Sequence, residues 1–378
     1  MTGLDEDSPW PMDGGCPTRI SRAAGALLPL SATSTLTYAA DTEGESIVGS
    51  PVVDGQGNVY VSTSRIGPEG AIAVVHAYGD KGGPLWELVF KSELAGPLLL
   101  TRFGGIPSVL VTTSFQLRLV SRDGKDVIGG VASPGAFITG SPVVSGGVVF
   151  FASADGKLHA WRPETMGPDV AHATYDDGSP DAALLSPAVA PDGTVYFVKM
   201  LANQTGGFLL ALTTTSAPLG LKKKWSAPFK GSVIGGRLAV AGDGTIVFAT
   251  TKAILGFTAA GDAAFSVPAV VGESLPAILG DRVFHAGSNG TLLAISTKGT
   301  VAYESPAGYG SSFLISDEGA VTFLGLAPQQ VNVLDGRTGS TLASVMVPIS
   351  SVQGGRVSID LSGRPLFAIG SHVYGVSD

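Results

Sequence analysis

Short apolar runs separated by glycine- or proline-containing turns recur along the whole chain. Residues 140–167 show the pattern in full: a Ser-Pro start leads into three apolar runs, which are separated by Gly146-Gly147 and by Asp155-Gly156. Apolar runs of this length between turn residues are typical of β-strands. The start recurs at anchor residues spaced 37 to 50 residues apart: Pro51, Pro97, Pro142, Pro187, Arg237, Pro276, Phe313 and Arg356. Eight units with a period in the forties are typical of a β-propeller with four-stranded blades.

Each unit resolves into four predicted strands. The second is the most apolar, as in "VVFFAS" and "TIVFAT", which predicts that both of its faces are covered. The third carries a small residue at one position, in Ala77, Ala160, Ala211, Gly256, Ala294 and Gly375. The fourth carries an aromatic residue that we expect to cover the seam between neighbouring sheets, in Trp86, Trp225, Phe265 and Tyr303. The predicted fold is all-β: an eight-bladed β-propeller of four-stranded antiparallel blades.

The two ends of the chain are predicted to meet. The last unit stops at "SHVYGVSD" (371–378), which is its third strand, so its outer strand is missing. The segment "STLTYAAD" (34–41) has the alternation of a fourth strand, and supplying it from the N-terminus would close the ring and remove an exposed edge. We therefore predict a single propeller over 34–378, in which 34–41 completes the last blade. Residues 1–33 are predicted to form an N-terminal lead-in segment that is partly loose.

Composition and charge argue against several classes of binding partner and against a membrane span. Only 14% of the residues are charged and the formal net charge is −8, which argues against nucleic acid, because binding a phosphate backbone needs clustered Lys and Arg. No uninterrupted apolar run approaches the roughly 18–20 residues of a membrane span. Cys16 is the only cysteine, so no disulfide can form within the chain. "MTGLDEDSPWPMDGGC" is acidic rather than apolar, so we expect neither a signal peptide in the sequence as given nor a lipid anchor at Cys16.

The chain resembles the PQQ-like β-propeller repeat family, named for quinoprotein dehydrogenases that use pyrroloquinoline quinone (PQQ). The resemblance rests on the number of units, on "VLDGRTGSTLA" (333–343), which matches the family's docking motif at Asp335, Thr338 and Gly339, and on the Trp-Pro-Met lead-in within 8–23. In size the chain is similar to the propeller lipoprotein of the outer-membrane protein assembly complex. The family's enzymes hold PQQ beneath a vicinal disulfide, with Ca²⁺ beside it. Because this chain has one cysteine, we expect neither cofactor.

Three polar residues share one position of the repeat. His76 and His159 precede the small residue of the third strand in the first and third units, and Arg118 holds that position in the second unit. On neighbouring blades they would form a polar or anion-binding cluster. The alternative is that each is a partly buried side chain satisfied by backbone carbonyls between the blades. A metal site is disfavoured, because the arginine repels a cation and no carboxylate shares the position.

Three aromatic residues are candidates for a partner-binding rim. Phe137, Phe229 and Tyr309 lie in connections that lead into a new unit, and exposed aromatic side chains on loops can anchor a partner. The alternative is that they cap the edge of the core.

The sequence favours binding over catalysis. It contains no Gly-x-Ser-x-Gly elbow, phosphate-binding loop or His-Glu-x-x-His motif, so we assign no catalytic residue. The predicted function is a non-catalytic propeller scaffold that displays loops to a protein or polysaccharide partner. The alternative is a PQQ-dependent, dehydrogenase-like enzyme with a degenerate site. The compartment does not follow from the residues; the family resemblance alone implies a bacterial periplasm or cell surface.

Overall fold

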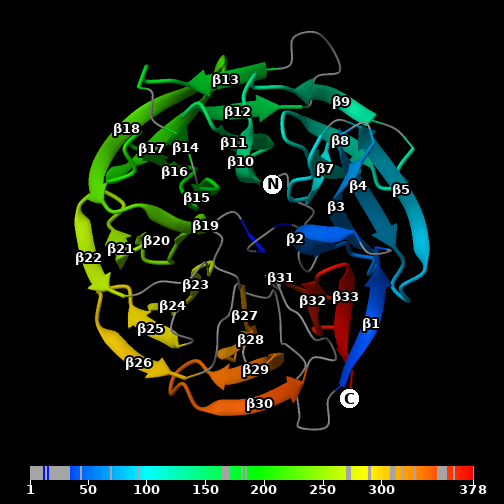
Figure 1. Ribbon diagram of the computed structural model, residues 1–378. Coiled ribbons are helices and arrows are strands. Elements are labelled where there is room, and N and C mark those ends of the chain that lie inside the picture. Colours follow the sequence, from blue (N-terminus) through cyan, green and yellow to red (C-terminus); the bar gives the residue numbers. More distant parts are fainter. Residues whose placement is uncertain are drawn as a thin grey trace.

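The computed structural model consists of β-sheets arranged around a common centre (Figure 1). It describes residues 12, 15–16, 35–42, 45–68, 70–91, 93–125, 127–163, 171–179, 182–183, 185–269, 274–287, 291–306, 312–316, 318–326, 329–346, 356–360 and 362–377. No helix occurs in these ranges, so they include none that is long and apolar enough to cross a membrane. The prediction of an all-β chain built from four-stranded antiparallel sheets is confirmed.

The described strands form eight sheets, which we number along the chain. Sheet 1 contains β2 (Ser46–Val53), β3 (Val59–Gly67), β4 (Gly70–Tyr78) and β5 (Pro84–Lys91). Sheet 2 contains β6 (Leu99–Phe103), β7 (Ile106–Thr112), β8 (Leu117–Ser121) and β9 (Val127–Ala132). Sheet 3 contains β10 (Ile138–Ser145), β11 (Val148–Ser153), β12 (Leu158–Arg162) and β13 (Ala171–Tyr175). In each sheet the strands pair in sequence order.

Sheet 4 contains β14 (Ala182–Ala183), β15 (Ala188–Val189), β16 (Val195–Met200), β17 (Gly206–Ser216) and β18 (Leu219–Lys230). Sheet 5 contains β19 (Val233–Val240), β20 (Ile246–Thr250), β21 (Ala253–Phe257) and β22 (Ala263–Pro268). Sheet 6 contains β23 (Ala277–Leu279), β24 (Arg282–Ala286), β25 (Leu292–Ser296) and β26 (Val301–Ser305). Sheet 7 contains β27 (Phe313–Ile315), β28 (Ala320–Leu326), β29 (Gln329–Asp335) and β30 (Thr341–Met346).

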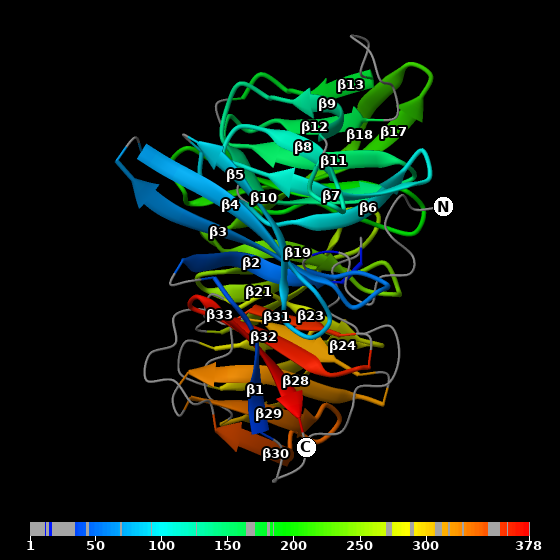
Figure 2. The same cartoon turned by 90° about the vertical axis from the view of Figure 1, so that its right-hand side faces the viewer.

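Sheet 8 combines both ends of the chain. Its strands are β31 (Arg356–Ile359), β32 (Pro365–Ile369), β33 (His372–Ser377) and β1 (Thr35–Asp41), and β1 pairs antiparallel with β33. Figures 1 and 2 both show the blue β1 beside the red β33. The backbone N–H of Thr42 donates to the carbonyl of Ser371 (2.9 Å), which ties the link between β1 and β2 to sheet 8. Most of the predicted lead-in segment, 1–33, lies outside the described residues.

Sheet 4 departs from the four-stranded expectation, because its first strand is split into β14 and β15, which both pair with β16. The break falls at Ser186-Pro187. Ser186 turns its N–H away from the sheet and donates it to the carbonyl of Gly236 (2.9 Å), while proline has no N–H to donate. The first strands of sheets 1, 3 and 5 carry a register shift at the same place. The split in sheet 4 is therefore a stronger form of an irregularity that other units share.

The core lies within and between the sheets. Every residue of the second strands β11, β16 and β20 is buried, as expected for strands covered on both faces. Residues from sheets 2, 3 and 4 share one buried cluster, which also includes Met12 of the lead-in segment. Met12 is 1% exposed and forms an isolated antiparallel bridge with Leu99. The described part of the lead-in is thus anchored against the start of sheet 2.

Candidate functional site

The candidate residues gather at one end of the strands. In a four-stranded antiparallel sheet, the turn between strands two and three and the connection from strand four to the next sheet lie at the same end; we call this end the upper face. His76, Arg118 and His159 lie near it on β4, β8 and β12 and pair with Val61, Val111 and Phe151 of the second strands. They therefore occupy equivalent positions. Leucine holds this position in sheets 4, 5 and 6, in Leu210, Leu255 and Leu293.

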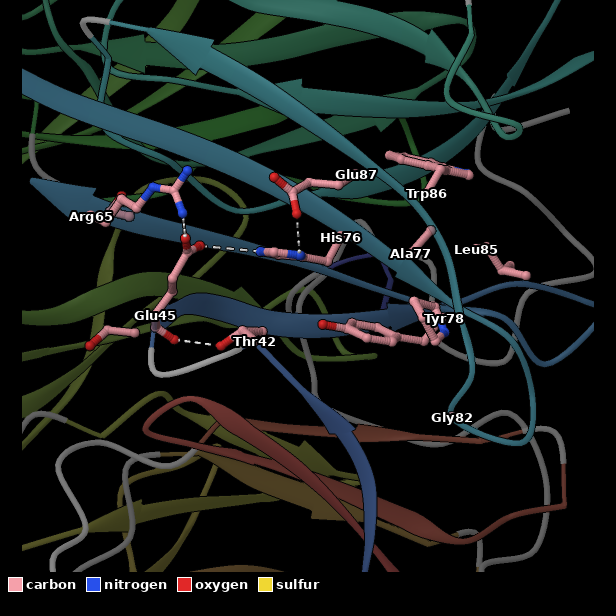
Figure 3. A pocket seen from close by; sticks show the side chains of 13 residues that line it. Thr42, Glu45, Arg65, His76, Ala77, Tyr78, Gly82, Leu85, Trp86 and Glu87 are labelled. Carbon is pink, nitrogen blue, oxygen red and sulfur yellow. Dashed lines mark hydrogen bonds and ion pairs between the residues drawn. The ribbon is translucent and has the colours of Figure 1, made fainter. Parts of the chain in front are cut away.

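A polar groove with a volume of about 750 Å³ runs along sheet 1 (Figure 3). Its central group is Glu45, whose side chain is 9% exposed. The Glu45 carboxylate accepts hydrogen bonds from the Thr63 hydroxyl and the Arg65 guanidinium and lies 3.2 Å from His76 Nε2. On its other side His76 faces Glu87, with 3.7 Å between Nδ1 and the carboxylate. The groove thus holds Glu45 in ion-pair contact with Arg65 and in hydrogen-bond contact with Thr63 and His76.

The charge of Glu45 is maintained by these contacts. Burial alone would raise the pKa of Glu45, but the hydrogen bonds from Thr63 and His76 and the charge of Arg65 outweigh it, so its pKa lies below the usual value. Thr42 fixes the backbone beside it, because its hydroxyl donates to the carbonyl oxygens of Glu45 (2.6 Å) and Ser371 (2.8 Å). The groove is therefore held rigidly between sheets 1 and 8.

Sheet 2 repeats the arrangement with Arg118. The Arg118 guanidinium donates to Glu93 (3.3 Å) and Gln116, and lies 5.0 Å from the centre of the Phe90 ring. The Thr113 hydroxyl also donates to Glu93. Sequence reasoning missed Glu45 and Glu93, although both lie a few residues before a first-strand anchor. Glu45 lies six residues before Pro51 and Glu93 four residues before Pro97, so an acidic residue shortly before the anchor is the signal that would have found them.

In sheet 3 the corresponding side chain is almost fully buried. His159 stacks on Phe151 (4.9 Å between ring centres) and on His172 (5.3 Å). Its nitrogens lie 2.9 Å from the Ser153 hydroxyl and 3.1 Å from that of Thr174. Burial, reinforced by His172, lowers the pKa of His159 to about 4, so the ring is neutral at pH 7. The described hydrogen-bond and ion-pair partners of His76, Arg118 and His159 are side chains of their own sheets and flanking connections, and Arg118 also lies over the Phe90 ring of sheet 1.

The three aromatic residues predicted to form a partner-binding rim do not share one environment. Phe137 is 54% exposed and lies 4.3 Å from Phe115, ring centre to ring centre. Phe229 is only 8% exposed and packs edge-on against Phe248 at 5.0 Å. Tyr309 lies outside the described residues. Phe137 is thus accessible, whereas Phe229 forms part of a groove floor.

That groove lies between sheets 4 and 5, has a volume of about 990 Å³, and is mainly apolar. Its apolar lining comes from β18, β21 and β22: Pro228, Phe229, Ala253, Leu255, Phe257, Ala263, Ala264, Phe265 and Pro268. Among the described residues that line it, the charged side chains are Lys230 and Lys252. Leu255 of sheet 5 occupies the position that His76 occupies in sheet 1. The apolar groove and the polar groove therefore lie at equivalent positions of the repeat and differ in the polarity of their lining.

The residues do not fit a PQQ and calcium site. The chain has a single cysteine, Cys16, so a vicinal disulfide cannot form. Within the described ranges, no group of three or more His, Cys, Asp or Glu side chains could hold a metal ion. Glu45 and Glu93 are each committed to threonine and to a cation. No step can therefore be assigned to that cofactor.

Solved structures with the same architecture decide the fold. BamB from Moraxella catarrhalis aligns over 91% of this chain and 97% of its own, with 14% identity and a TM-score of 0.61. Europium-containing methanol dehydrogenase, a PQQ quinoprotein, aligns over 98% of this chain and 91% of its own, with 12% identity and a TM-score of 0.68. The chain has a β-propeller fold. The resemblance to PQQ-like propellers is confirmed at this level.

The chain is also similar in fold to a yeast protein. Sqt1 from Saccharomyces cerevisiae aligns over 93% of this chain and 99% of its own, with 10% identity and a TM-score of 0.62. No protein-family model and no curated protein sequence matches the chain. At identities of 10–14%, the likeness extends to the fold and not to an activity.

Proposed function

We propose that this chain is a non-catalytic propeller scaffold that binds a protein partner on the upper face of its ring. The apolar groove between sheets 4 and 5 carries the proposal. It combines a preformed aromatic floor, in Phe229 and Phe265, with two flanking lysines. Protein-binding surfaces commonly join a central apolar patch to a charged rim.

The polar side of the upper face supports binding over catalysis. A general base or nucleophile needs a partner group that leaves it free to react. Glu45 and Glu93 instead sit in networks with threonine and a cation, and His159 is enclosed between two rings. These groups stabilise the ring, and no observation favours the enzyme alternative or a polysaccharide partner.

The architecture we propose for this scaffold is one closed ring over 34–378. The eight sheets are its blades, β1 completes the last blade, and 1–33 is a lead-in anchored at Met12. The pairing of β1 with β33 and the contact of Thr42 with Ser371 support closure. A closed ring holds the upper-face loops in fixed positions, which lowers the entropy lost when a partner binds.

Photo-crosslinking in the native cell tests the function. A benzophenone amino acid is placed at Ser266, which is exposed and lines the groove, and separately at Ser226. Ser226 is the matched control, because it is also exposed, holds the equivalent position on β18 and does not line the groove. We expect a discrete protein adduct from Ser266 only. Equal adducts from both positions, or none from either, would contradict the proposal.

The enzyme alternative has its own readout. Purified protein is incubated with PQQ and Ca²⁺ and then desalted. We expect no retained quinone absorbance and no dye reduction with alcohols or sugars. Stoichiometric retention of PQQ would overturn the non-catalytic assignment.

A further inference from the structure

We infer that the groove between sheets 4 and 5 takes an acidic peptide segment of the partner, one that presents apolar side chains to the groove floor and carboxylates to its rim. This inference rests on the proposed function and specifies the occupant. Three properties of the groove support it: its floor is apolar, its rim is positively charged, and its floor residues are held in fixed positions.

The floor is apolar, with Leu255 at the position that His76 holds in sheet 1 and Arg118 in sheet 2. Phe229, Leu255 and Phe257 are 8%, 9% and 4% exposed, so each lines the groove with only the edge of its side chain. The Phe257 and Phe229 rings both contact Phe248, at 5.8 Å and 5.0 Å between ring centres. Aromatic and aliphatic side chains of a partner would bury further apolar surface here, which favours binding.

The rim of the groove is basic. Lys230 and Lys252 are both exposed, and no aspartate or glutamate is among the described residues that line the groove. The whole chain carries a net charge of −8, so the positive charge of this rim is opposite in sign to the net charge of the protein. Such a local reversal attracts an acidic segment to this seam and repels a basic one.

The floor is held in place before any partner arrives. Gly207 makes room for Phe229, because a β-carbon at Gly207 would lie 2.8 Å from the Phe229 Cζ and 2.1 Å from the carbonyl oxygen of Lys199. Gly231, directly after β18, has φ +95°, a conformation that favours glycine, and its N–H donates to the carbonyl of Thr205 (2.8 Å). A fixed floor loses little entropy on binding, so a short segment suffices as a ligand.

A displayed library of random dodecapeptides tests the inference. The library is selected on the full-length protein, and enriched peptides are measured against three variants. Ser266→Tyr fills the groove. Ser226→Tyr places the same side chain at the matched position on β18. The double variant Lys230→Glu/Lys252→Glu reverses the charge of the rim. Thermal melting of each variant confirms that the fold is retained before binding is compared.

We expect enriched peptides to combine aromatic or aliphatic residues with Asp or Glu, and to bind Ser226→Tyr like the parent protein. Ser266→Tyr should abolish their binding. The charge reversal should weaken it more than tenfold, because removal of two screened ion pairs of about 0.7 kcal/mol each already gives about tenfold and the introduced glutamates add repulsion, and added salt should then strengthen the residual binding. Two outcomes would overturn the acidic specificity and leave the proposed function standing. In the first, Ser266→Tyr blocks the binding of the enriched peptides but these carry no excess of Asp or Glu. In the second, the peptides bind the charge-reversed variant as tightly as the parent protein. Failure to select any peptide sensitive to Ser266→Tyr would overturn both.

Discussion

The indole of Trp86 on sheet 1 occupies the space that a β-carbon of Gly124 on sheet 2 would need, since that atom would lie 2.5 Å from the ring. The indole N–H donates to the carbonyl of Arg122 (2.7 Å). The same contact recurs in other sheets, where an outer-strand aromatic covers a glycine with positive φ in the next sheet: Trp225 on Gly261, Phe265 on Gly299 and Tyr303 on Gly339. This repeated contact joins sheet 1 to sheet 2 and joins sheets 4, 5, 6 and 7 to one another.

Gly124→Ala should therefore destabilise the protein strongly. A left-handed φ, here +72°, costs a non-glycine residue about 1–2 kcal/mol, and overpacking typically adds about 1–3 kcal/mol. Urea unfolding should show a total loss of about 2–5 kcal/mol. Gly193→Ala is the control, because its φ is +81° and nothing lies within 4 Å of the added β-carbon, so only the backbone cost remains. Equal losses for the two variants would mean that the ring contact contributes nothing.

The fold could be predicted from the sequence because successive repeats carry similar residues at equivalent positions. The aromatics expected to cover seams do so at Trp86, Trp225, Phe265 and Tyr303. The third, seventh and eighth units depart from this pattern, since Ala173, Ala343 and Thr37 stand at the outer-strand position that Trp86 holds opposite Ala77. The split first strand of sheet 4 was also not predicted, because a Ser-Pro start occurs in units whose first strand stays whole.

Removal of β1 tests the proposed closure. Deleting residues 1–41 takes away the strand that pairs with β33 and leaves an open sheet edge. We expect a lower melting temperature and increased aggregation. Deleting residues 1–33 keeps β1 but removes Met12, so the difference between the two truncations isolates the strand. If both truncations melt at the same temperature, β1 does not close the ring.

The candidate site was harder to predict than the fold, because its partners are distant in sequence. His76 was singled out by its position in the repeat, but Glu45, 31 residues earlier, decides its surroundings. Phe229 was expected on an exposed rim and is 8% exposed, because Gly206-Gly207 lets its ring sink into the seam. Repeat position identifies which side chains share a face; it does not say which neighbours they contact.

Glu45→Ala should destabilise the protein at pH 7 by about 1–3 kcal/mol, because it removes a buried acceptor shared by Thr63, Arg65 and His76. The folded-state pKa of Glu45 is lowered, so its contribution is complete above the unfolded value of 4.5 and is lost as the pH falls through the folded value. Urea unfolding of both proteins at pH 7 and in acid should show the difference shrinking.

Glu87→Ala provides the control for Glu45. Glu87 faces the other nitrogen of His76 at 3.7 Å, but its side chain is half exposed. An exposed pair of this kind contributes less than about 1 kcal/mol. A larger loss from Glu87→Ala than from Glu45→Ala would contradict the view that the groove is organised around Glu45.

His285 should make the protein sensitive to mild acid. It is 1% exposed, its Nδ1 lies 2.6 Å from the Ser274 hydroxyl, and burial lowers its pKa from 6.5 to about 4. Above pH 6.5 neither the folded nor the unfolded state binds the proton. Between pH 6.5 and 4 the unfolded chain takes it up and the folded chain does not, so stability falls as the pH falls, by up to about 3 kcal/mol.

His285→Leu should flatten this part of the pH profile, measured as the free energy of unfolding at intervals from pH 8 to pH 4. His159 acts in the same direction, because its pKa is also lowered to about 4, so some acid sensitivity should remain in the single variant and decrease further when both histidines are replaced. The slope between pH 6.5 and 4 is the deciding quantity, since the substitution itself shifts stability equally at every pH. An unchanged slope in His285→Leu would show that His285 is protonated equally in the folded and unfolded states.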